Sequence, residues 1–353
     1  MSVDHFQMGN DYFHMGKYIE AIKAYEEALI IDPEGADIYY NIGVSYFSLE
    51  DYENSIFYFL KAIEKRNDFL DAYNNMSICY SRLGRTDKVI ETLKQILKLN
   101  PYYIPAYYNL GIIYYSMKNY EEAAIAYKQV VDLKPDFPEA HNNLGGTYKV
   151  LGRIEDSIRE LTIAIKLKHD YAEAYNNLGN IYYDIGKYDE AIENYSIAIH
   201  YKPKLPEAYN NMGNAYKSLG KFQEAEVALK KAIELNPLLP EAYNNLSIVM
   251  SKLGKLEETF KYLDKALELN PDYAEALNNY GLALKNNKEY EKALDKFLKA
   301  ISISPNLAQA HFNLAETYLL TGKKNEAIKE FNILKELNID LANKLDVIMK
   351  NSK

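Results

Sequence analysis

A pattern of 34 residues repeats ten times along the chain without a single insertion. Residues 172–205, AEAYNNLGNIYYDIGKYDEAIENYSIAIHYKPKL, show it most completely. A strict period of this length is typical of a solenoid, in which each unit packs only on its neighbours. We therefore predict ten units in one solenoid, at residues 2–35, 36–69, 70–103, 104–137, 138–171, 172–205, 206–239, 240–273, 274–307 and 308–341.

Within each unit the spacing of apolar residues predicts two helices, helix A at about places 1–14 and helix B at about places 18–30. Places 4, 7, 8 and 11 of helix A form one apolar stripe, and places 20, 24 and 27 of helix B form the answering one. Small residues stand at place 8: Gly9, Gly43, Ser77, Gly111, Gly145, Gly179, Gly213, Ser247, Gly281 and Ala315. We expect them to let the paired helices approach closely.

Place 15 is glycine in seven units, which is what a left-handed cap at the end of helix A favours. Glu50, Lys118 and Lys288 stand there in the other three, and we expect those turns to be costlier. After the last unit, residues 342–353 are predicted to be a capping helix and tail, with the helix starting at Asp340 as its N-cap.

These features resemble the tetratricopeptide repeat (TPR) family over nearly the whole chain. The runs Asn-Leu-Gly and Asn-Met-Gly look most like the superhelical TPR arm of O-linked N-acetylglucosamine transferases, although no glycosyltransferase domain follows in this sequence. The resemblance implies an all-α fold, a right-handed TPR superhelix of ten helix-turn-helix repeats. It also implies that the far side of helix A lines a concave inner surface.

The charge and hydropathy of the chain exclude some classes of partner. The net charge of −9 argues against nucleic acid, which needs clustered Lys and Arg. No apolar run is long enough to span a membrane, and no secretory leader is visible, so we expect a cytoplasmic protein that binds no membrane. The single cysteine, Cys79, fits a reducing compartment and is expected to be a buried hydrophobe.

No catalytic constellation is visible, neither HExxH nor CxxC nor a phosphate-binding loop, so we predict a non-enzyme without cofactors. Histidines occupy place 4 in three units (His5, His141 and His311), where other units have Tyr or Leu. These units lie far apart, so the histidines are expected to replace core aromatics and not to bind metal.

Place 6 of helix A, on the side facing away from the apolar stripe, is asparagine in nine units. These are Asn41, Asn75, Asn109, Asn143, Asn177, Asn211, Asn245, Asn279 and Asn313. Asparagine is a poor helix former, so local propensity does not explain the row. In the transferases that this chain resembles, a ladder of this kind holds the backbone of an extended substrate. The alternative is that each amide ties adjacent helices together.

Places 5 and 12 of the same face differ along the chain. Both places are aromatic in the first, second and fourth repeats (Phe6, Phe13, Tyr40, Phe47, Tyr108 and Tyr115). The fifth to ninth repeats instead have Asn at place 5, and three of them have a lysine at place 12 (Lys149, Lys217 and Lys285). We predict that Tyr40, Phe47, Tyr108 and Tyr115 belong with the asparagines to a peptide-binding surface. The alternative is that a chain with 34 tyrosines scatters them.

Two functions remain. The first is a non-catalytic scaffold that binds an extended peptide or protein segment along the inner groove through the asparagine ladder. The second is the substrate-recognition arm of a glycosyltransferase or another enzyme whose catalytic domain is absent from this chain, either because it is on a different chain or because it was left out. A carboxylate clamp for chaperone C-termini is excluded by the pattern, because place 5 never carries Lys and place 2 never carries a base. The sequence names neither the partner nor the oligomeric state.

Overall fold

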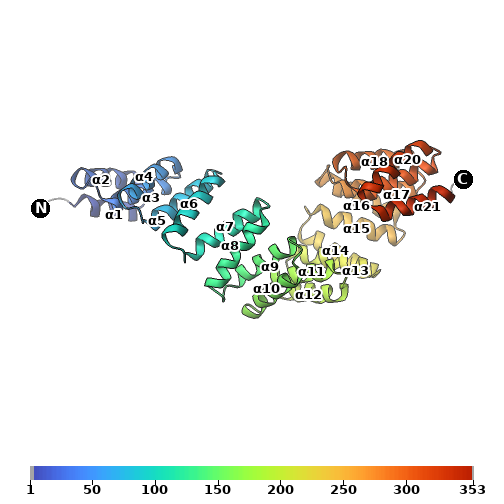
Figure 1. Ribbon diagram of the computed structural model, residues 1–353, viewed down its shortest axis with the longest axis horizontal. Coiled ribbons are helices and arrows are strands. Elements are labelled where there is room, and N and C mark those ends of the chain that lie inside the picture. The colour runs from blue at the N-terminus through green and yellow to red at the C-terminus, as the bar shows by residue number, and fades with distance from the viewer. Residues whose placement is uncertain (1–3, 352–353) are drawn as a thin grey trace. The chain divides into compact units, whose positions relative to one another are not determined.

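The computed structural model describes residues 4–351, which form 21 α-helices and no strand. The helices follow one another as antiparallel pairs, one pair to each repeat, with one further helix at the end (Figure 1). The prediction of an all-α fold with ten helix-turn-helix repeats and a capping helix is confirmed. Residues 2 and 3 of the first predicted repeat and residues 352–353 of the predicted tail lie outside the described residues.

The helices are α1 (His5–His14), α2 (Tyr18–Ile31), α3 (Ala36–Ser48), α4 (Tyr52–Lys65), α5 (Leu70–Arg82), α6 (Thr86–Leu99), α7 (Ile104–Ser116), α8 (Tyr120–Leu133), α9 (Pro138–Val150), α10 (Ile154–Leu167), α11 (Ala172–Asp184), α12 (Tyr188–Tyr201), α13 (Pro206–Ser218), α14 (Phe222–Leu235), α15 (Pro240–Lys252), α16 (Leu256–Leu269), α17 (Ala274–Asn286), α18 (Tyr290–Ile303), α19 (Ala308–Leu320), α20 (Lys324–Leu337) and α21 (Ile339–Asn351). Odd-numbered helices up to α19 are the predicted A helices, and even-numbered helices are the predicted B helices.

The glycine at place 8 sets the distance between the two helices of a pair. A Cβ atom added to Gly179 would lie 2.6 Å from Cε1 of Tyr195, and one added to Gly281 would lie 2.6 Å from Cε1 of Phe297. Both rings are fully buried. The large residue at place 24 therefore occupies the space that the missing side chain leaves, as the apolar stripes predict.

The turn between the helices of a pair is left-handed in every repeat. The seven glycines at place 15 have positive φ, for example 68° at Gly84 and 79° at Gly186. Glu50, Lys118 and Lys288 adopt the same conformation, with φ of 59°, 62° and 63°. A side chain with a Cβ atom is disfavoured there, so these three turns carry the strain that the sequence predicts.

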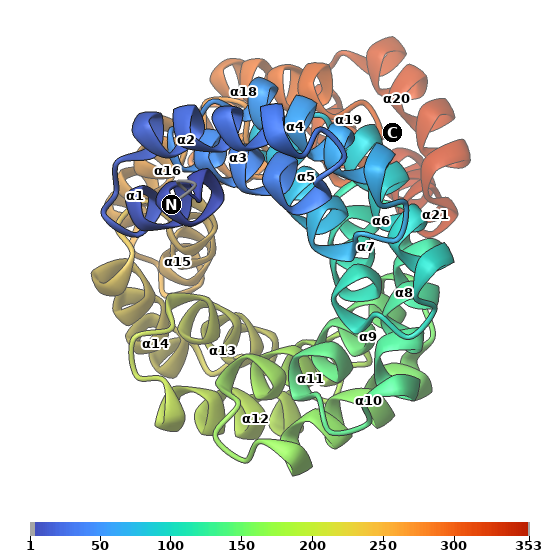
Figure 2. The same ribbon diagram turned by 90° about the vertical axis from the view of Figure 1, so that its left-hand side faces the viewer.

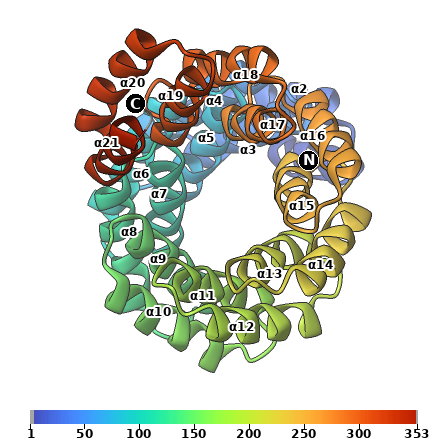
Figure 3. The same ribbon diagram turned by 90° about the vertical axis from the view of Figure 1, so that its right-hand side faces the viewer.

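The chain divides into two compact parts, each made of several repeats. From here on unit 1 means Met1–Lys168 and unit 2 means His169–Lys353. In unit 1 the helix pairs form a curved stack with the odd-numbered helices on its inner side (Figure 2). Unit 2, taken by itself, has the same arrangement, with α13, α15, α17 and α19 on the inner side (Figure 3).

Helix α21 covers the apolar end of the last repeat. Ala342 and Leu345 are buried in one cluster with Phe312 and Leu334 of helices α19 and α20. The helix begins at Ile339, one residue before the predicted start. Its cap is also different: Oδ1 of Asn338, and not Asp340, accepts a hydrogen bond from the backbone N–H of Leu341 at 3.0 Å.

Candidate functional site

The A-helix face is the surface made by places 5, 6, 9 and 12 of consecutive odd-numbered helices within each unit. The A helices themselves lie on the inner side of each curved stack (Figures 2 and 3). Most of the side chains of the A-helix face are half-buried. All nine place-6 asparagines lie on this face.

In unit 2 the place-6 amides form a row of hydrogen bonds between neighbouring A helices. In each, Nδ2 of the asparagine donates to Oδ1 of the place-5 asparagine of the preceding repeat. The bonds are Asn211 to Asn176 at 3.2 Å, Asn245 to Asn210 at 3.1 Å, Asn279 to Asn244 at 2.8 Å and Asn313 to Asn278 at 2.9 Å. We call these bonds, and their equivalents in unit 1, the inter-repeat ties.

Unit 1 makes the same ties with a different acceptor. Nδ2 of Asn75 donates to the hydroxyl of Tyr40 at 3.0 Å, and Nδ2 of Asn143 donates to the hydroxyl of Tyr108 at 3.1 Å. Asn41 follows a repeat that has phenylalanine at place 5. Its amide donates instead to Oδ1 of Asn10, at place 9 of that repeat, at 3.2 Å.

Among residues 4–351, Asn109 makes none of the inter-repeat ties described above. The side chain of Asn109 is exposed, and its amide makes no hydrogen bond with the rest of residues 4–351. Asn177 stands in the first repeat of unit 2 and is half-buried. Asn109 is therefore the place-6 residue at which a binding role can be separated from a structural one.

The ties support the interpretation in which the amides join adjacent helices. They do not use up the bonding capacity of the side chain, since an amide has two N–H donors and an oxygen that accepts twice. The tie uses one of these N–H groups and fixes the amide on the A-helix face. A peptide-binding role of the asparagines stays a prediction.

The predicted aromatic residues are mostly half-buried. The ring of Tyr40 packs 4.9 Å from that of Phe69, and the ring of Tyr108 packs 5.1 Å from that of Phe137. Burial raises the pKa of both phenols, so each hydroxyl stays a neutral hydrogen-bonding group. Phe47 is also half-buried, whereas Tyr115 is 40% exposed. Of the four, Tyr115 offers the largest accessible ring.

Two of the place-4 histidines are buried, as expected of core substitutes, but each also makes a polar pair that sequence reasoning missed. Nδ1 of His141 lies 2.7 Å from Glu160, and Nδ1 of His311 lies 2.6 Å from Glu330. The second ring nitrogen of each meets a proline carbonyl oxygen, as His311 does with Pro305 at 2.9 Å. The signal in the sequence is a glutamate 19 residues after each of these two histidines.

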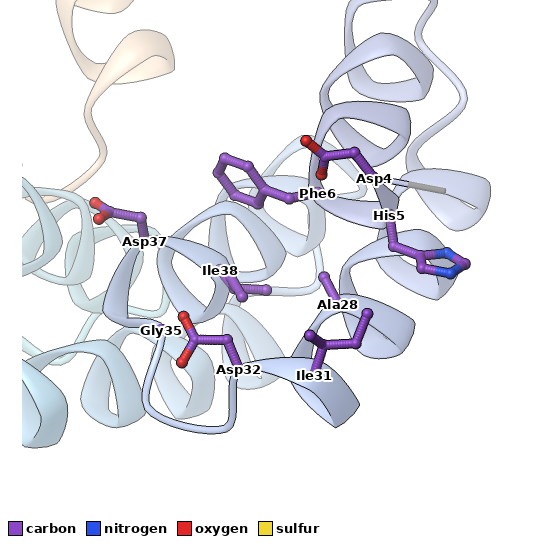
Figure 4. Close-up of a pocket in the computed structure, with 9 residues that line it drawn as sticks. All are labelled: Asp4, His5, Phe6, Ala28, Ile31, Asp32, Gly35, Asp37 and Ile38. Carbon is purple, nitrogen blue, oxygen red and sulfur yellow. The ribbon is translucent and has the colours of Figure 1, made fainter. Parts of the chain in front are cut away.

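The third of these histidines, His5, has Ala24 at the position of that glutamate, and its Nδ1 is buried without a partner. It lines an open cavity of about 530 Å³ together with Asp4, Phe6, Ala28, Ile31, Asp32, Gly35, Asp37 and Ile38 (Figure 4). None of the predicted peptide-binding residues lines this cavity.

Other side chains of residues 4–351 bear on metal binding, thiol chemistry and membrane insertion. No group of three or more His, Cys, Asp or Glu side chains there is arranged to hold a metal ion. Cys79 is buried as predicted, and burial raises the pKa of its thiol. None of the described helices combines the length and the apolar character needed to cross a membrane.

Comparison with protein families gives four matches. The model of the cilia and flagella-associated protein 70 C-terminal domain matches residues 102–343, which is more than half of the chain. Three tetratricopeptide repeat models match residues 9–50, 36–69 and 70–103. No curated protein matches the chain.

Solved structures share the fold at low identity. A chain of the APC/C hetero-tetramer Cut9-Hcn1 is 18% identical with a TM-score of 0.63, over 99% of this chain and 75% of that one. A tetratricopeptide repeat protein from Parabacteroides merdae is 20% identical with a TM-score of 0.60, over 70% of this chain and 98% of that one. The pilF protein of Pseudomonas aeruginosa is 20% identical with a TM-score of 0.52, over 60% and 96%.

Proposed function

The chain belongs to the family of the cilia and flagella-associated protein 70 C-terminal domain, a family of tetratricopeptide repeats, and we propose that it is a non-catalytic scaffold. It binds an extended peptide or protein segment along the A-helix face. The observation that carries this proposal is the row of inter-repeat ties, which holds a series of amides in fixed positions on the inner side of each unit.

Fixed amides suit an extended backbone. A strand-like segment rises about 3.3 Å per residue and presents alternating N–H and C=O groups. The oxygen of a tied asparagine and its second N–H can bond both kinds of group without reading side chains. Asn211 is an exception, because its Nδ2 also donates to Oδ1 of Asn180 at 3.0 Å. Because the amides are already ordered, binding costs little side-chain entropy. The resemblance to the O-linked transferases, in which such a ladder holds substrate backbone, supports the same proposal.

The aromatic residues extend this surface in unit 1. Tyr115 is exposed, and Phe47 is half-buried at the equivalent place 12 two repeats earlier. Rings of this kind supply contact area at low entropy cost beside the backbone-binding amides. Because the family is described from a protein associated with cilia and flagella, we propose that the partner is a protein of cilia or flagella. The chain would then act in the cytoplasm and in its ciliary extension.

The proposal is tested with a random library of linear peptides selected on the full chain. The affinity of a selected peptide is then compared between the wild type and Asn109→Ala. We expect this change to weaken binding about two- to tenfold, the loss of one hydrogen bond. Stability should stay level or rise by about 0.5 kcal/mol, because Ala is the better helix former.

Asn194→Ala is the matched control. Asn194 is a half-buried asparagine on helix α12, which is a B helix outside the A-helix face, and its amide donates to the backbone oxygen of Glu190 at 2.9 Å. This change should leave binding as it is. Methylating backbone amides of the peptide should weaken binding more than scrambling its side chains. The proposal is wrong if no peptide is enriched, or if Asn109→Ala and backbone methylation both leave the affinity unchanged.

A further inference from the structure

Two lysines occupy equivalent positions on the A-helix face of unit 2 but meet different surroundings. Lys285, at place 12 of the ninth repeat, forms an ion pair with Glu316, with Nζ 2.8 Å from Oε2. Glu316 stands at place 9 of the following repeat, 31 residues later. The pair is well covered, since the lysine side chain is 11% exposed. The charge of Lys285 is therefore balanced within the protein.

Lys217 stands at place 12 of the seventh repeat, and the residue 31 positions later is Ile248. The carboxylate that balances Lys285 is thus replaced by a hydrocarbon. Nζ of Lys217 donates to Oδ1 of Asn245 at 3.0 Å, and no carboxylate of residues 4–351 pairs with it. An ammonium group has three donors, so two remain for another acceptor.

The electrostatics of Lys217 agree with this geometry. Burial lowers the pKa of its ammonium group to about 8, and no neighbouring negative charge opposes the shift. An ammonium group held away from water without a counter-charge is destabilised. A ligand that brings a carboxylate to Nζ removes that cost, so binding energy is available at this position and is absent at Lys285.

A second polar group beside Lys217 also lacks a partner. Asn214 stands one helical turn before Lys217, at place 9 of the same repeat. Its Oδ1 is buried and accepts no hydrogen bond. Residues three apart in a helix are neighbours on its surface, so this unsatisfied acceptor stands beside the lysine that lacks a counter-charge.

We propose that Lys217 forms a subsite for a carboxylate of a bound peptide chain, with the carboxylate accepting from Nζ of Lys217. The subsite rests on the proposed function and adds a chemical preference to it. It differs from the clamp for chaperone C-termini, whose lysine places carry no base in this chain. Ile248 provides an apolar neighbour for the methylene groups of an acidic side chain.

The experiment selects the peptide library on the full chain and measures the affinity of an enriched acidic peptide and of its Asn or Gln counterpart. Lys217→Gln should weaken binding of the acidic peptide at least about tenfold and leave the amide counterpart unchanged. Ile248→Glu should have the same effect, because it supplies from within the protein the carboxylate that Glu316 supplies to Lys285. Circular dichroism verifies that both variants fold.

Lys252→Gln is the control for overall charge, since Lys252 is an exposed lysine of helix α15. It should weaken the acidic peptide only slightly, far less than Lys217→Gln does, and leave the amide counterpart unchanged. A peptide with an amidated C-terminus separates the two sources of the carboxylate. Lost binding assigns the subsite to a C-terminus, and retained binding assigns it to an Asp or Glu side chain.

Two results overturn the proposal in different ways. If peptides are enriched but Lys217→Gln and Ile248→Glu leave the preference for the acidic peptide intact, the subsite is wrong and the scaffold function stands. If no peptide is enriched, both fall. A direct measurement by NMR of the Lys217 side chain should show its pKa rising when the acidic peptide binds, and an unchanged pKa contradicts the subsite.

Discussion

The two units make the same inter-repeat tie with different acceptors. In unit 1 the amide of Asn143 donates to the hydroxyl of Tyr108, and in unit 2 the amide of Asn313 donates to the oxygen of Asn278. The donor is the same residue type at the same place in both units. We infer that the packing of neighbouring A helices fixes the position of the acceptor oxygen. The residue type that supplies this oxygen at place 5 can vary.

The comparison predicts unequal costs when the donor is removed. Asn313 and Asn278 are 2% and 5% exposed, so Asn313→Ala leaves a buried oxygen unpaired and should lower the free energy of unfolding by about 1–3 kcal/mol. Asn143→Ala should cost less, about 0.5–1 kcal/mol, because the half-buried hydroxyl of Tyr108 can bond water.

Urea denaturation of the two variants measures this difference. Equal losses would show that the acceptor type does not matter and that the two units are equivalent at this tie. Because a repeat array can unfold in steps, the transition is followed by circular dichroism and by tyrosine fluorescence together.

The turns at place 15 offer a feature that should not differ between the units. Lys118 in unit 1 and Lys288 in unit 2 have φ of 62° and 63°. Lys118→Gly and Lys288→Gly should each raise stability by about 1 kcal/mol, since glycine adopts this conformation without strain. Gly84→Ala, at φ of 68°, should lose a similar amount. A gain in only one unit would break the symmetry, and thermal melting detects it.

The smallest expected effect concerns pH. The hydrogen bond to Glu330 raises the pKa of His311, so the folded state binds its proton more tightly than the unfolded state. The stability from this pair is therefore fully present below the ordinary histidine pKa of about 6.5 and is lost as the pH rises through the raised value. Glu330→Gln should remove this part of the pH dependence. The control variant Glu160→Gln, which changes the equivalent pair of unit 1, should leave the pH dependence due to His311 unchanged.

The pairing of the helices could be predicted because it depends on residues within one repeat. The contact of Gly179 with Tyr195 spans 16 residues and follows from the apolar periodicity, and the strained turns follow from single residues such as Lys118. The start of α21 was misplaced because Asn338 and Asp340 are both good N-caps, and local preference alone does not choose between them.

The ties and the buried pairs could not be predicted in the same way. The acceptor of Asn143 is a tyrosine that also packs in the core, and hydropathy assigns Tyr108 to packing or to recognition but not to a hydrogen bond. The partner of His311 lies on the other helix of its pair, at a place where most repeats need no carboxylate. Both interactions depend on side-chain geometry between helices, which a periodic pattern does not contain.

The ties described above between places 6 and 5 run in one direction, from a donor in the later repeat to an acceptor 35 residues earlier. A ribosome adds about 5–20 residues per second, so the donor follows its acceptor by about 2–7 s. During synthesis every acceptor therefore leaves the ribosome before its donor does. Helices form within about a microsecond, far faster than the chain grows, so a tie can close as soon as the later repeat is made.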